Sequence, residues 1–491
     1  MEKDRFSQLL GSDQEIIDSV LQWFGQICAI PHRSGNERAL SEMLDRVCTG
    51  FGWKTQRDAL HNLRVDIPGT PGFEHLPPVI IQSHLDMVCA VTEGSGYEPD
   101  RDPVTMVDGD ILRSDGRSSL GADNGLSTAI ALFLLNKDLR RGPVRLILTT
   151  QEEVGMHGAN HVNPEWVQDC KYLINGDTAT SDALLFSCAG GRRDGFTRPT
   201  ERTAPTFGNA YELVLSGFRG GHSSGRVALS QGNAIKLLTF FLQQLKEHTP
   251  YELADLRGGH AQNAIPLEAR AVIAVEDARE LTVAVDVFRT QLAETYGSTD
   301  PELQVTLLPV LLPEQVWTAQ LTEQTLNLIT LLHHGVFAMH KEIPNMPGAS
   351  CNTGLVHITP DDQLEIVTFT RCVSAFTEQQ MASTHIAAAK LCGFRLDTHC
   401  HAGWNGRSDS PLVRLVTGIY KEQNGSDMVV LATHAGLEPG IFGAKNPNLD
   451  MVSIGADISA LHSTEESVYL PSVPKFTRLL AGVLEALAAL G

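Results

Sequence analysis

The stretch Leu146-Ile-Leu-Thr-Thr-Gln-Glu-Glu-Val-Gly-Met-His-Gly158 begins as an apolar, β-prone run and ends in two adjacent carboxylates, Glu152 and Glu153. A buried strand that delivers acids to its carboxyl end is where α/β proteins place their chemistry. Neighbouring strand residues point to opposite faces, so both acids reach one site only if the backbone turns, and we expect the turn at Val154-Gly155. We interpret one acid as a metal ligand and the other as a proton carrier.

Outward from this stretch, the chain alternates between strand-like and helix-like patterns. Most of the predicted strands are short apolar runs, and the predicted helices show apolar residues at helical spacing. The predicted strands are 53–58, 62–67, 78–86, 144–150, 172–175, 428–432 and 451–455, and the predicted helices are 13–29, one from 36 onward, 126–135, 409–422 and 474–490. Residues 91–120 are polar and rich in Gly and Asp, which predicts a loop with a hairpin. The alternation predicts an α/β layer with a mainly parallel mixed sheet and helices on both faces.

The pattern changes in the middle of the chain. Strands are predicted at 211–218, 269–275, 303–311, 355–358, 364–370 and 394–401, with helices at 234–245, 278–295 and 377–392. A β-β-α-β order occurs twice, which predicts an inserted α+β domain of two related, ferredoxin-like halves. The expected organisation is a catalytic domain in two segments, 1–189 and 404–491, with a lid domain at 190–403.

Composition narrows the class of protein. The apolar fraction of 42% supports a sizeable core, and 58 acidic against 38 basic residues give a formal charge of −20. Nucleic acids and anionic membranes require clustered cations, so neither is an expected partner. Nine cysteines without a C-x-x-C pair indicate reduced thiols. No signal-type or membrane-spanning apolar run is evident, and we expect a cytoplasmic protein.

Histidines and carboxylates recur where predicted strands of the α/β layer end: His84, Asp86, Asp123, Glu152, Glu153, Asp177, His434 and His462. Mixed imidazoles and carboxylates without thiolate suit Zn²⁺, Mn²⁺ or Co²⁺ in a catalytic site. Two imidazoles and three carboxylates are too many for one tetrahedral ion with an open position, and they fit two ions that share a bridging carboxylate and a water. Each residue alone also has an ordinary structural interpretation, such as a helix cap for Asp123.

Five motifs carry a family resemblance, and they are Ile81-Gln-Ser-His-Leu-Asp86, Gly121-Ala-Asp-Asn-Gly125, Thr150-Gln-Glu-Glu-Val-Gly155, Asn175-Gly-Asp177 and Gly220-Gly-His-Ser223. In this order they resemble the dinuclear zinc peptidases and deacylases related to aminoacylase and glutamate carboxypeptidase. Within that group the chain is most similar to the bacterial aminoacyl-histidine dipeptidases, also called cytosolic nonspecific dipeptidases. Further matches are Ile30-Pro-His-Arg-Ser-Gly-Asn-Glu37, Asn263-Ala-Ile-Pro266, His434-Ala-Gly-Leu-Glu438 and Asp450-Met-Val-Ser-Ile-Gly455.

The resemblance implies roles for the metal site. His84 and Asp177 would hold one ion, Glu153 and His462 the other, and Asp123 would bridge both, with a cis peptide bond after Asp123. The ions would be zinc, with manganese or cobalt as alternatives. Asp86 would orient the His84 ring, and Glu152 would be the general base that takes a proton from the attacking water and returns it to the leaving amine.

The resemblance also implies roles for the lid. His222 would help to hold the oxyanion, in the site of a partner subunit, which implies a homodimer through the lid. Asn263 and Arg371 would bind the carboxylate of a small peptide substrate, for which a guanidinium is geometrically suited. On the residues alone, His222 is an ordinary loop histidine and Arg371 an ordinary strand arginine.

Three functions stay open on the sequence. The first is a dipeptidase for short unblocked peptides, including Xaa-histidine dipeptides such as carnosine. The second is an N-acyl amino acid deacylase with the same metals, and the third is an inactive binding or scaffold homologue. The chain departs from the dipeptidase pattern at Thr178-Ala-Thr-Ser-Asp182, where an acidic run is usual, and at Pro439, where a cysteine is usual. Both departures leave the substrate preference undecided.

Overall fold

The computed structural model describes residues 2–107 and 111–490. By its internal contacts the chain divides into two compact units: unit 1 contains residues 1–188, 404–433 and 437–491, and unit 2 contains residues 189–403 and 434–436. The inserted domain expected at 190–403 corresponds to most of unit 2. Residues 108–110, within the expected hairpin region, lie outside the described residues, while β4 (Met106–Val107) and β5 (Ile111–Ser114) on either side of them pair antiparallel.

Unit 1 is built on an eight-stranded mixed sheet in the order β1-β2-β6-β3-β7-β23-β8-β22. Its centre is parallel, with β3 next to β6 and β7, and β7 next to β23. The strands are β1 (Lys54–Arg57), β2 (Leu63–Ile67), β3 (Val79–His84), β6 (Val144–Thr149), β7 (Tyr172–Asn175), β8 (Ala183–Cys188), β22 (Val429–Thr433) and β23 (Asp450–Ser453). The expected mixed, mainly parallel sheet is confirmed at its centre.

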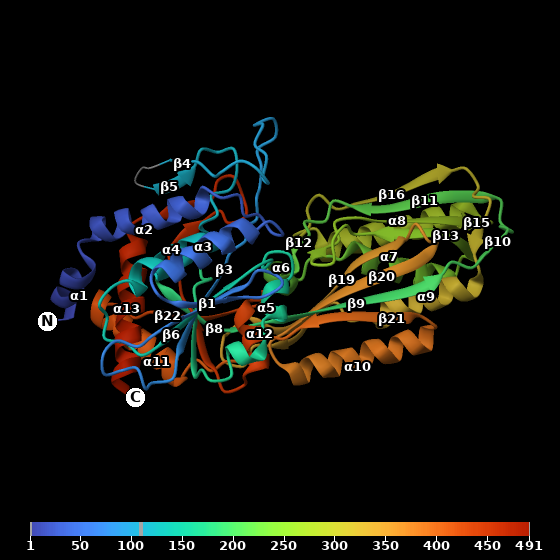
Figure 1. Ribbon diagram of the computed structural model, residues 1–491. Helices are drawn as coiled ribbons and strands as arrows, with labels where there is room; N and C mark the ends of the chain where they lie inside the picture. Colours follow the sequence, from blue (N-terminus) through green and yellow to red (C-terminus); the bar gives the residue numbers. More distant parts are fainter. Residues whose placement is uncertain (1, 108–110, 491) are drawn as a thin grey trace. The chain divides into compact units, whose positions relative to one another are not determined.

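Both faces of this sheet are covered. Every residue of β3 and of β6 is buried, which is possible only when helices or loops lie on each face. The helices of unit 1 are α1 (Glu2–Leu10), α2 (Asp13–Cys28), α3 (Arg38–Gly50), α4 (Ala122–Leu135), α5 (His157–His161), α11 (Pro411–Asn424), α12 (Glu438–Lys445) and α13 (Ser472–Leu490) (Figure 1). A 3₁₀ turn, Pro164–Trp166, and two short strands, β24 (Ile458–Ser459) and β25 (Ser467–Tyr469), complete the unit. The predicted helices thus lie where the periodicity placed them, within two residues of the predicted bounds, except that α4 begins four residues before the predicted start at 126.

Unit 2 is organised around a nine-stranded antiparallel sheet in the order β16-β11-β15-β13-β19-β20-β9-β21, with β18 paired to β19. Its strands are β9 (Gly190–Pro199), β11 (Asn209–Ser216), β13 (Tyr251–Gly258), β15 (Ala269–Val275), β16 (Gln304–Val310), β18 (Gly335–Met339), β19 (Pro347–Ile358), β20 (Gln363–Cys372) and β21 (Arg395–His401). Its long helices are α7 (Ala234–Lys246), α8 (Ala278–Tyr296), α9 (Ala319–Leu331) and α10 (Ala375–Cys392). One hydrophobic core contains residues from all four helices.

The two halves of unit 2 are nested, not consecutive. β11, α7, β13, β15, α8 and β16 form one half, with the ferredoxin-like strand order 4-1-3-2. β9, α9, β19, β20, α10 and β21 form the other, with the same order reversed across the sheet. The first half is inserted between β9 and α9 of the second, and the halves meet where β13 pairs with β19 (Figure 1). The sequence pattern indicated two related halves but missed β9, β13 and α9, and therefore missed the nesting.

Two short elements of unit 2 carry predicted site residues. β12 (Gly221–His222) pairs with β14 (Ala264–Ile265), so His222 lies opposite Ala264 in the register. α6 (Ser223–Arg226) follows directly, and β10 (Arg202–Thr203) pairs with β17 (Val316–Trp317) elsewhere in the unit. The pairing of β12 with β14 is why His222 and Asn263, far apart in the sequence, are neighbours in the fold.

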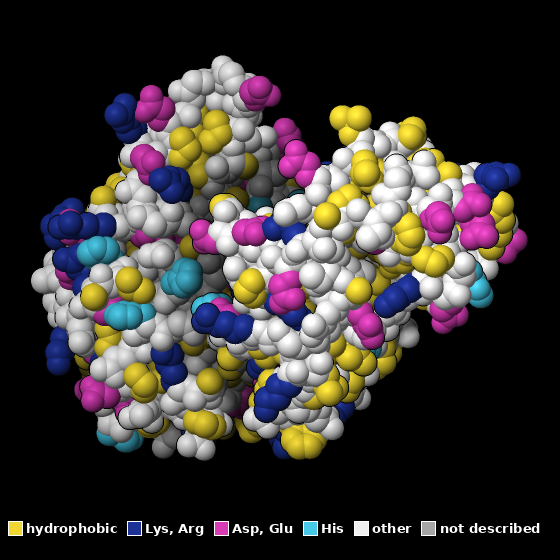
Figure 2. All heavy atoms as spheres, turned by 90° about the vertical axis from the view of Figure 1, so that its right-hand side faces the viewer, with side chains coloured by type: hydrophobic (Ala, Val, Ile, Leu, Met, Phe, Trp, Pro, Cys, Tyr) yellow, Lys and Arg dark blue, Asp and Glu magenta, His cyan; other side chains and the backbone are white. Residues whose placement is uncertain are grey.

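On the face drawn in Figure 2, Lys and Arg side chains are scattered among acidic and hydrophobic ones. Among the described residues, no helix combines the length and the apolar character that a membrane span requires.

Candidate metal centre and substrate pocket

The strand β6 ends at Thr149, one residue before its predicted end, and Glu152 and Glu153 lie beyond it. Gln151 already has a left-handed φ of 54°. The N–H of Gly155 donates to the carbonyl of Glu152 at 3.0 Å, and Gly155 has a φ of 121°, which favours glycine. The turn expected at Val154-Gly155 is present, but the backbone leaves the strand before Glu152. Both acids are therefore free of the alternation that a strand imposes.

Four of the five predicted metal ligands lie at strand ends or in loops of unit 1, and Asp123 lies in the first turn of α4. Two groups of three have all their candidate ligand atoms within 4.8 Å of one another: His84, Asp123 and Asp177, and Asp123, Glu153 and His462. Asp123 belongs to both. A third group combines His84 with Glu152 and Glu153.

The two oxygens of Asp123 face different imidazoles. Oδ1 lies 3.1 Å from Nε2 of His84, and Oδ2 lies 3.4 Å from Nε2 of His462. Nε2 of His84 is also 3.7 Å from Oδ1 of Asp177, and Nε2 of His462 is 3.0 Å from Oε1 of Glu153. The peptide bond between Asp123 and Asn124 is cis, as the resemblance implies. This arrangement is suited to a carboxylate that bridges two cations.

The residues present fit a pair of divalent cations. The donors are two imidazoles and three carboxylates, a set that suits zinc, manganese or cobalt. Oε1 of Glu153 is buried and has no hydrogen-bond partner among the described residues, although it lies beside His462. A buried carboxylate oxygen without a hydrogen bond is costly unless a cation binds it.

The ionisation of the site also calls for positive charge. Burial lowers the pKa of His84, but its carboxylate partners, Asp123 first among them, outweigh burial and hold that pKa well above its usual value. Hydrogen bonds with Asp123 and Glu153 raise the pKa of His462 to about 10. Burial, followed by the charge of Asp123, raises the pKa of Asp177 to about 7. The negative charge of the carboxylates is thus balanced by protons, which lie on carboxyl groups or on the imidazoles. Bound cations would displace these protons.

Asp86 organises the backbone of the two acids as well as the His84 ring. Its Oδ1 accepts the N–H of Glu152 at 2.9 Å, and its Oδ2 accepts the N–H of Glu153 at 3.1 Å. Nδ1 of His84 lies 2.9 Å from the main-chain carbonyl of Asp86 and 3.6 Å from the carboxylate. The nearer partner of the ring is therefore the carbonyl, while the carboxylate holds the Glu152–Glu153 turn and accepts from Ser34 Oγ at 2.8 Å.

Glu152 forms a group with His84 and Glu153 but belongs to neither of the two groups that contain Asp123. It is half-buried by exposed area, and burial raises the pKa of its carboxyl well above the usual value. A carboxyl whose pKa is raised holds a proton more readily, which suits a group that must accept a proton and return it. Its backbone is fixed by Asp86, independently of its side chain.

A buried polar chain lies under the metal-ligand loops, and the sequence analysis did not assign it a role. Oε2 of Glu438, in the first turn of α12, accepts from Nε2 of Gln82 and, at 2.8 Å, from Oγ1 of Thr149. Oε1 of Gln82 accepts from Nδ2 of Asn175 at 2.6 Å, and Oδ1 of Asn175 accepts the N–H of Asp177 at 3.1 Å. Burial raises the pKa of Glu438 to about 7. The only signal in the sequence was the motif that ends at Glu438.

His434 was grouped with the strand-end residues on sequence, but it is not in any of the metal groups found among the described residues. It belongs by its contacts to unit 2, where its Nε2 lies 2.7 Å from Oγ of Ser350. Burial, followed by the charge of Arg371, lowers the pKa of His434 to about 3, so its ring is neutral near pH 7. His434 therefore follows a strand, as expected, but it is neither one of the five predicted ligands nor part of a metal group found among the described residues.

The predicted oxyanion residue His222 and the two predicted substrate-binding residues, Asn263 and Arg371, form one cluster in unit 2. Nη2 of Arg371 and Nδ2 of Asn263 each lie 3.4 Å from Nε2 of His222. Arg371 is 6% exposed, its Nε donates to Oγ of Ser223 at 3.3 Å, and its guanidinium lies 4.9 Å from the centre of the Phe369 ring. Among the described residues no carboxylate forms an ion pair with Arg371. A buried guanidinium without a counter-ion is suited to an anionic group of a ligand.

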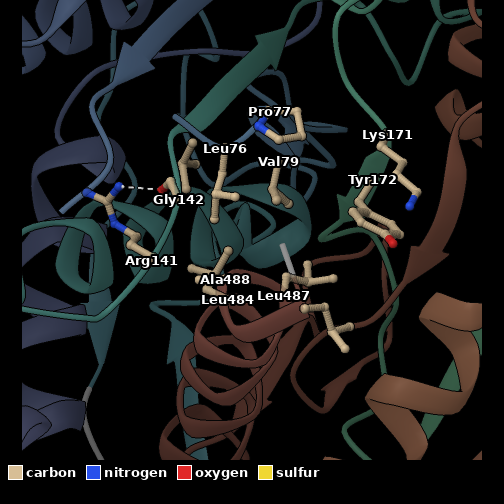
Figure 3. A pocket seen from close by; sticks show the side chains of 12 residues that line it. Leu76, Pro77, Val79, Arg141, Gly142, Lys171, Tyr172, Leu484, Leu487 and Ala488 are labelled. Carbon is tan, nitrogen blue, oxygen red and sulfur yellow. Dashed lines mark hydrogen bonds between the residues drawn. The ribbon is translucent and has the colours of Figure 1, made fainter. Parts of the chain in front are cut away.

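A different pocket lies at the amino ends of the central strands of the unit 1 sheet. It is lined by Val79, Val144 and Tyr172, which are the first residues of β3, β6 and β7, and by Leu484 and Leu487 of α13 (Figure 3). Its lining is mainly apolar. Parallel α/β sheets carry their chemistry at the carboxyl ends of the strands, so this pocket is not the catalytic site.

Comparison with known proteins agrees with this geometry. The curated cytosol non-specific dipeptidase of Escherichia coli (strain K12) is 32% identical over 472 residues, which cover 95% of this chain and 97% of that protein. The crystal structure of aminoacylhistidine dipeptidase from Vibrio alginolyticus matches with a TM-score of 0.85 and 29% identity over 98% of each chain. An M20 family metallo-carboxypeptidase from Sulfolobus solfataricus shares the fold, with a TM-score of 0.56 and 16% identity over 96% of this chain and 100% of that one.

The resemblance expected from the motifs is confirmed. The model of peptidase family M20/M25/M40 matches residues 80–486, a range that includes all five predicted metal ligands, Glu152 and the lid residues. The chain belongs to peptidase family M20/M25/M40.

Proposed function

We propose that this chain is a metal-dependent dipeptidase that hydrolyses short unblocked peptides, Xaa-histidine dipeptides among them. Family membership and the two relatives named as dipeptidases support the reaction class. The observation that carries the mechanism is the pair of ligand groups joined through Asp123, with Glu152 beside them. His84 and Asp177 would hold one ion, Glu153 and His462 the other.

The protein groups divide the reaction between them. When bound, two divalent ions, which we propose to be zinc, supply the positive charge that acidifies water and polarises the scissile carbonyl. Glu152 takes the proton of the attacking water, and the hydroxide oxygen forms a bond to the carbonyl carbon. Glu152 then gives the proton to the leaving nitrogen as the carbon–nitrogen bond breaks. Asp86 accepts the backbone N–H of Glu152 and thereby keeps Glu152 in place during the whole reaction.

Unit 2 would act as the lid and bind the substrate. Arg371 and Asn263 would bind the free carboxylate of the dipeptide, and the neutral His222 ring would donate to the developing oxyanion. Burial, followed by the charge of Arg371, lowers the pKa of His222, which favours the neutral ring. A lid with this chemistry requires a free carboxyl-terminal end on the substrate.

We also propose a cytoplasmic homodimer that associates through unit 2. The name of the cytosol dipeptidase and the nine free cysteines support the compartment. The outer strand β16 and the residues after it expose Leu308, Val310, Leu311 and Leu312, a row of apolar side chains at a sheet edge. Analytical ultracentrifugation tests the assembly, and an enzyme that is active as a strict monomer contradicts it.

The test of the reaction is a substrate panel with defined metals. The protein is stripped with a chelator, reloaded with Zn²⁺, Mn²⁺ or Co²⁺, and assayed on dipeptides, including β-alanyl-histidine, and on N-acetyl amino acids. We expect hydrolysis of dipeptides. Hydrolysis of acetylated amino acids without dipeptides would favour a deacylase, and absence of bound metal with no rescue would favour a binding or scaffold protein.

A further inference from the structure

One buried carboxylate of unit 1 has no place in the reaction described above. Glu466 is 3% exposed and accepts three main-chain hydrogen bonds from a single turn. Its Oε2 accepts the N–H of Leu120 at 2.9 Å and of Gly121 at 3.0 Å, and its Oε1 accepts the N–H of Asp123 at 3.1 Å. Charge-assisted bonds of this kind are stronger than bonds between neutral groups, and they offset part of the cost of burying the charge.

Glu466 connects two distant segments that carry metal-ligating side chains. It lies four residues after His462 in the sequence, and its three donors include the N–H of Asp123, 343 positions away. The imidazole of His462 and the carboxylate of Asp123 lie 3.4 Å apart. The distance between these two side chains therefore depends on how the two loops are joined, and the Glu466 carboxylate makes that connection.

The loop of His462 has a conformation that needs support. Ala460 and His462 have φ values of 52° and 61°, in the left-handed region that non-glycine residues rarely adopt. Oγ of Ser463 donates to the carbonyl of Ala460 at 2.6 Å, and the N–H of Glu466 donates to the carbonyl of Ser463 at 3.2 Å, which closes the loop on itself. Such a compact loop moves as one piece, so its attachment at Glu466 also fixes the position of His462.

We propose that Glu466 is a positioning residue that sets the separation of Asp123 and His462, and thereby the affinity of the ion that these two residues hold with Glu153. This inference rests on the proposed metal centre. The ordinary alternative is that Glu466 only caps α4, since it accepts the N–H of Asp123 in the first turn and the N–H groups of Leu120 and Gly121 just before the helix. A cap alone affects the stability of the fold, whereas a positioning residue affects one of the two ions selectively.

The chain provides a matched control in the adjacent residue. Glu465 is exposed, so Glu465→Gln removes the same charge one position away without touching the turn. Glu466→Gln removes the charge and places an amide donor against a backbone donor. Glu466→Asp keeps the charge but withdraws it by one methylene, so it separates the effect of position from the effect of charge.

The metal-free proteins are titrated with Co²⁺ against a competing chelator, and visible absorption follows the cobalt coordination. We expect two ions in the wild type and in Glu465→Gln. In Glu466→Gln and in Glu466→Asp we expect one ion to bind about 10- to 100-fold more weakly, with a changed absorption band, while the other ion keeps its affinity. Melting of the metal-free proteins, measured in parallel, verifies that each variant is folded.

Three results would overturn the inference. They are wild-type affinity for both ions in Glu466→Gln, restored affinity in Glu466→Asp, and equal weakening of both ions, which would indicate a long-range charge effect. Failure of the metal centre itself is seen separately, because the wild type would then bind fewer than two ions before any variant is made.

Discussion

Glu152 and Asp123 should separate catalysis from metal binding, although they lie in one small site. The two oxygens of Asp123 face different imidazoles, so Asp123→Ala takes a ligand from both proposed ions. Glu152 shares a group with His84 and Glu153 but is absent from both groups that contain Asp123. Its backbone N–H is held by Asp86 at 2.9 Å, so Glu152→Gln leaves the loop in place.

The expected magnitude follows from the role of Glu152 as the proton carrier. Loss of a general base typically lowers a rate by about 10²- to 10⁴-fold, which corresponds to about 3–5 kcal/mol of transition-state stabilisation. Because the amide of Gln keeps the size of Glu, this loss should be almost entirely in kcat. Asp123→Ala should lose activity together with metal.

The assay combines metal content by mass spectrometry with dipeptide hydrolysis at saturating Zn²⁺. Glu152→Gln should retain two ions per chain and lose turnover, whereas Asp123→Ala should retain fewer ions after the same dialysis. Equal metal loss in the two variants would refute the assignment, since it would make Glu152 a ligand and leave the base unidentified.

Three further predictions concern the lid, the metals and a buried ion pair. Arg371→Lys should raise KM for dipeptides by about 10- to 100-fold, since a charged hydrogen bond contributes about 1.5–3 kcal/mol, and it should not change KM for dipeptide amides. Removal of the metals with a chelator should lower the melting temperature by leaving carboxylates unpaired, and added Zn²⁺ should restore it; an unchanged melting temperature would count against a dinuclear centre. Burial lowers the pKa of His385, but the hydrogen bond at 2.7 Å to Asp194 outweighs it and raises the pKa to about 9. Because the folded-state pKa is raised above about 6.5, the pair stabilises the fold fully below pH 6.5 and loses up to about 3 kcal/mol as the pH rises through 9. Urea unfolding between pH 6 and 10 should show this loss in the wild type and not in His385→Gln.

Much of unit 1 follows from local patterns in the sequence. The segments 79–84 and 144–149 each contain a short apolar, β-prone run, and both form strands in which every residue is buried; helices such as α2 follow from their apolar spacing. Four of the five proposed ligands could be named because they lie in short motifs, whereas His462 was assigned through the family resemblance. His434 shows the limit of prediction from position alone. It follows a strand, as predicted, but it is in none of the metal groups found among the described residues.

Unit 2 was harder to predict for a physical reason. Two of its strand pairs, β9 with β20 and β9 with β21, join residues more than a hundred positions apart, and no local pattern encodes which strand will be the neighbour. β9 is interrupted by glycine and charged residues, so its alternation is weak. Nesting of one half within the other separates β9 from α9 and hides the repeat from a linear search.

The sequence by itself determined the class of fold of unit 1, the family and the residues whose chemistry suits metal and proton transfer, because periodicity and short motifs are local properties. Only the tertiary structure decided that Asp123 faces two imidazoles, that Asp86 holds the Glu152–Glu153 turn, and that Glu466 joins the loops of Asp123 and His462. These are contacts between segments up to 343 positions apart. They depend on which loops meet beyond the strand ends, and the packing of the whole unit decides this.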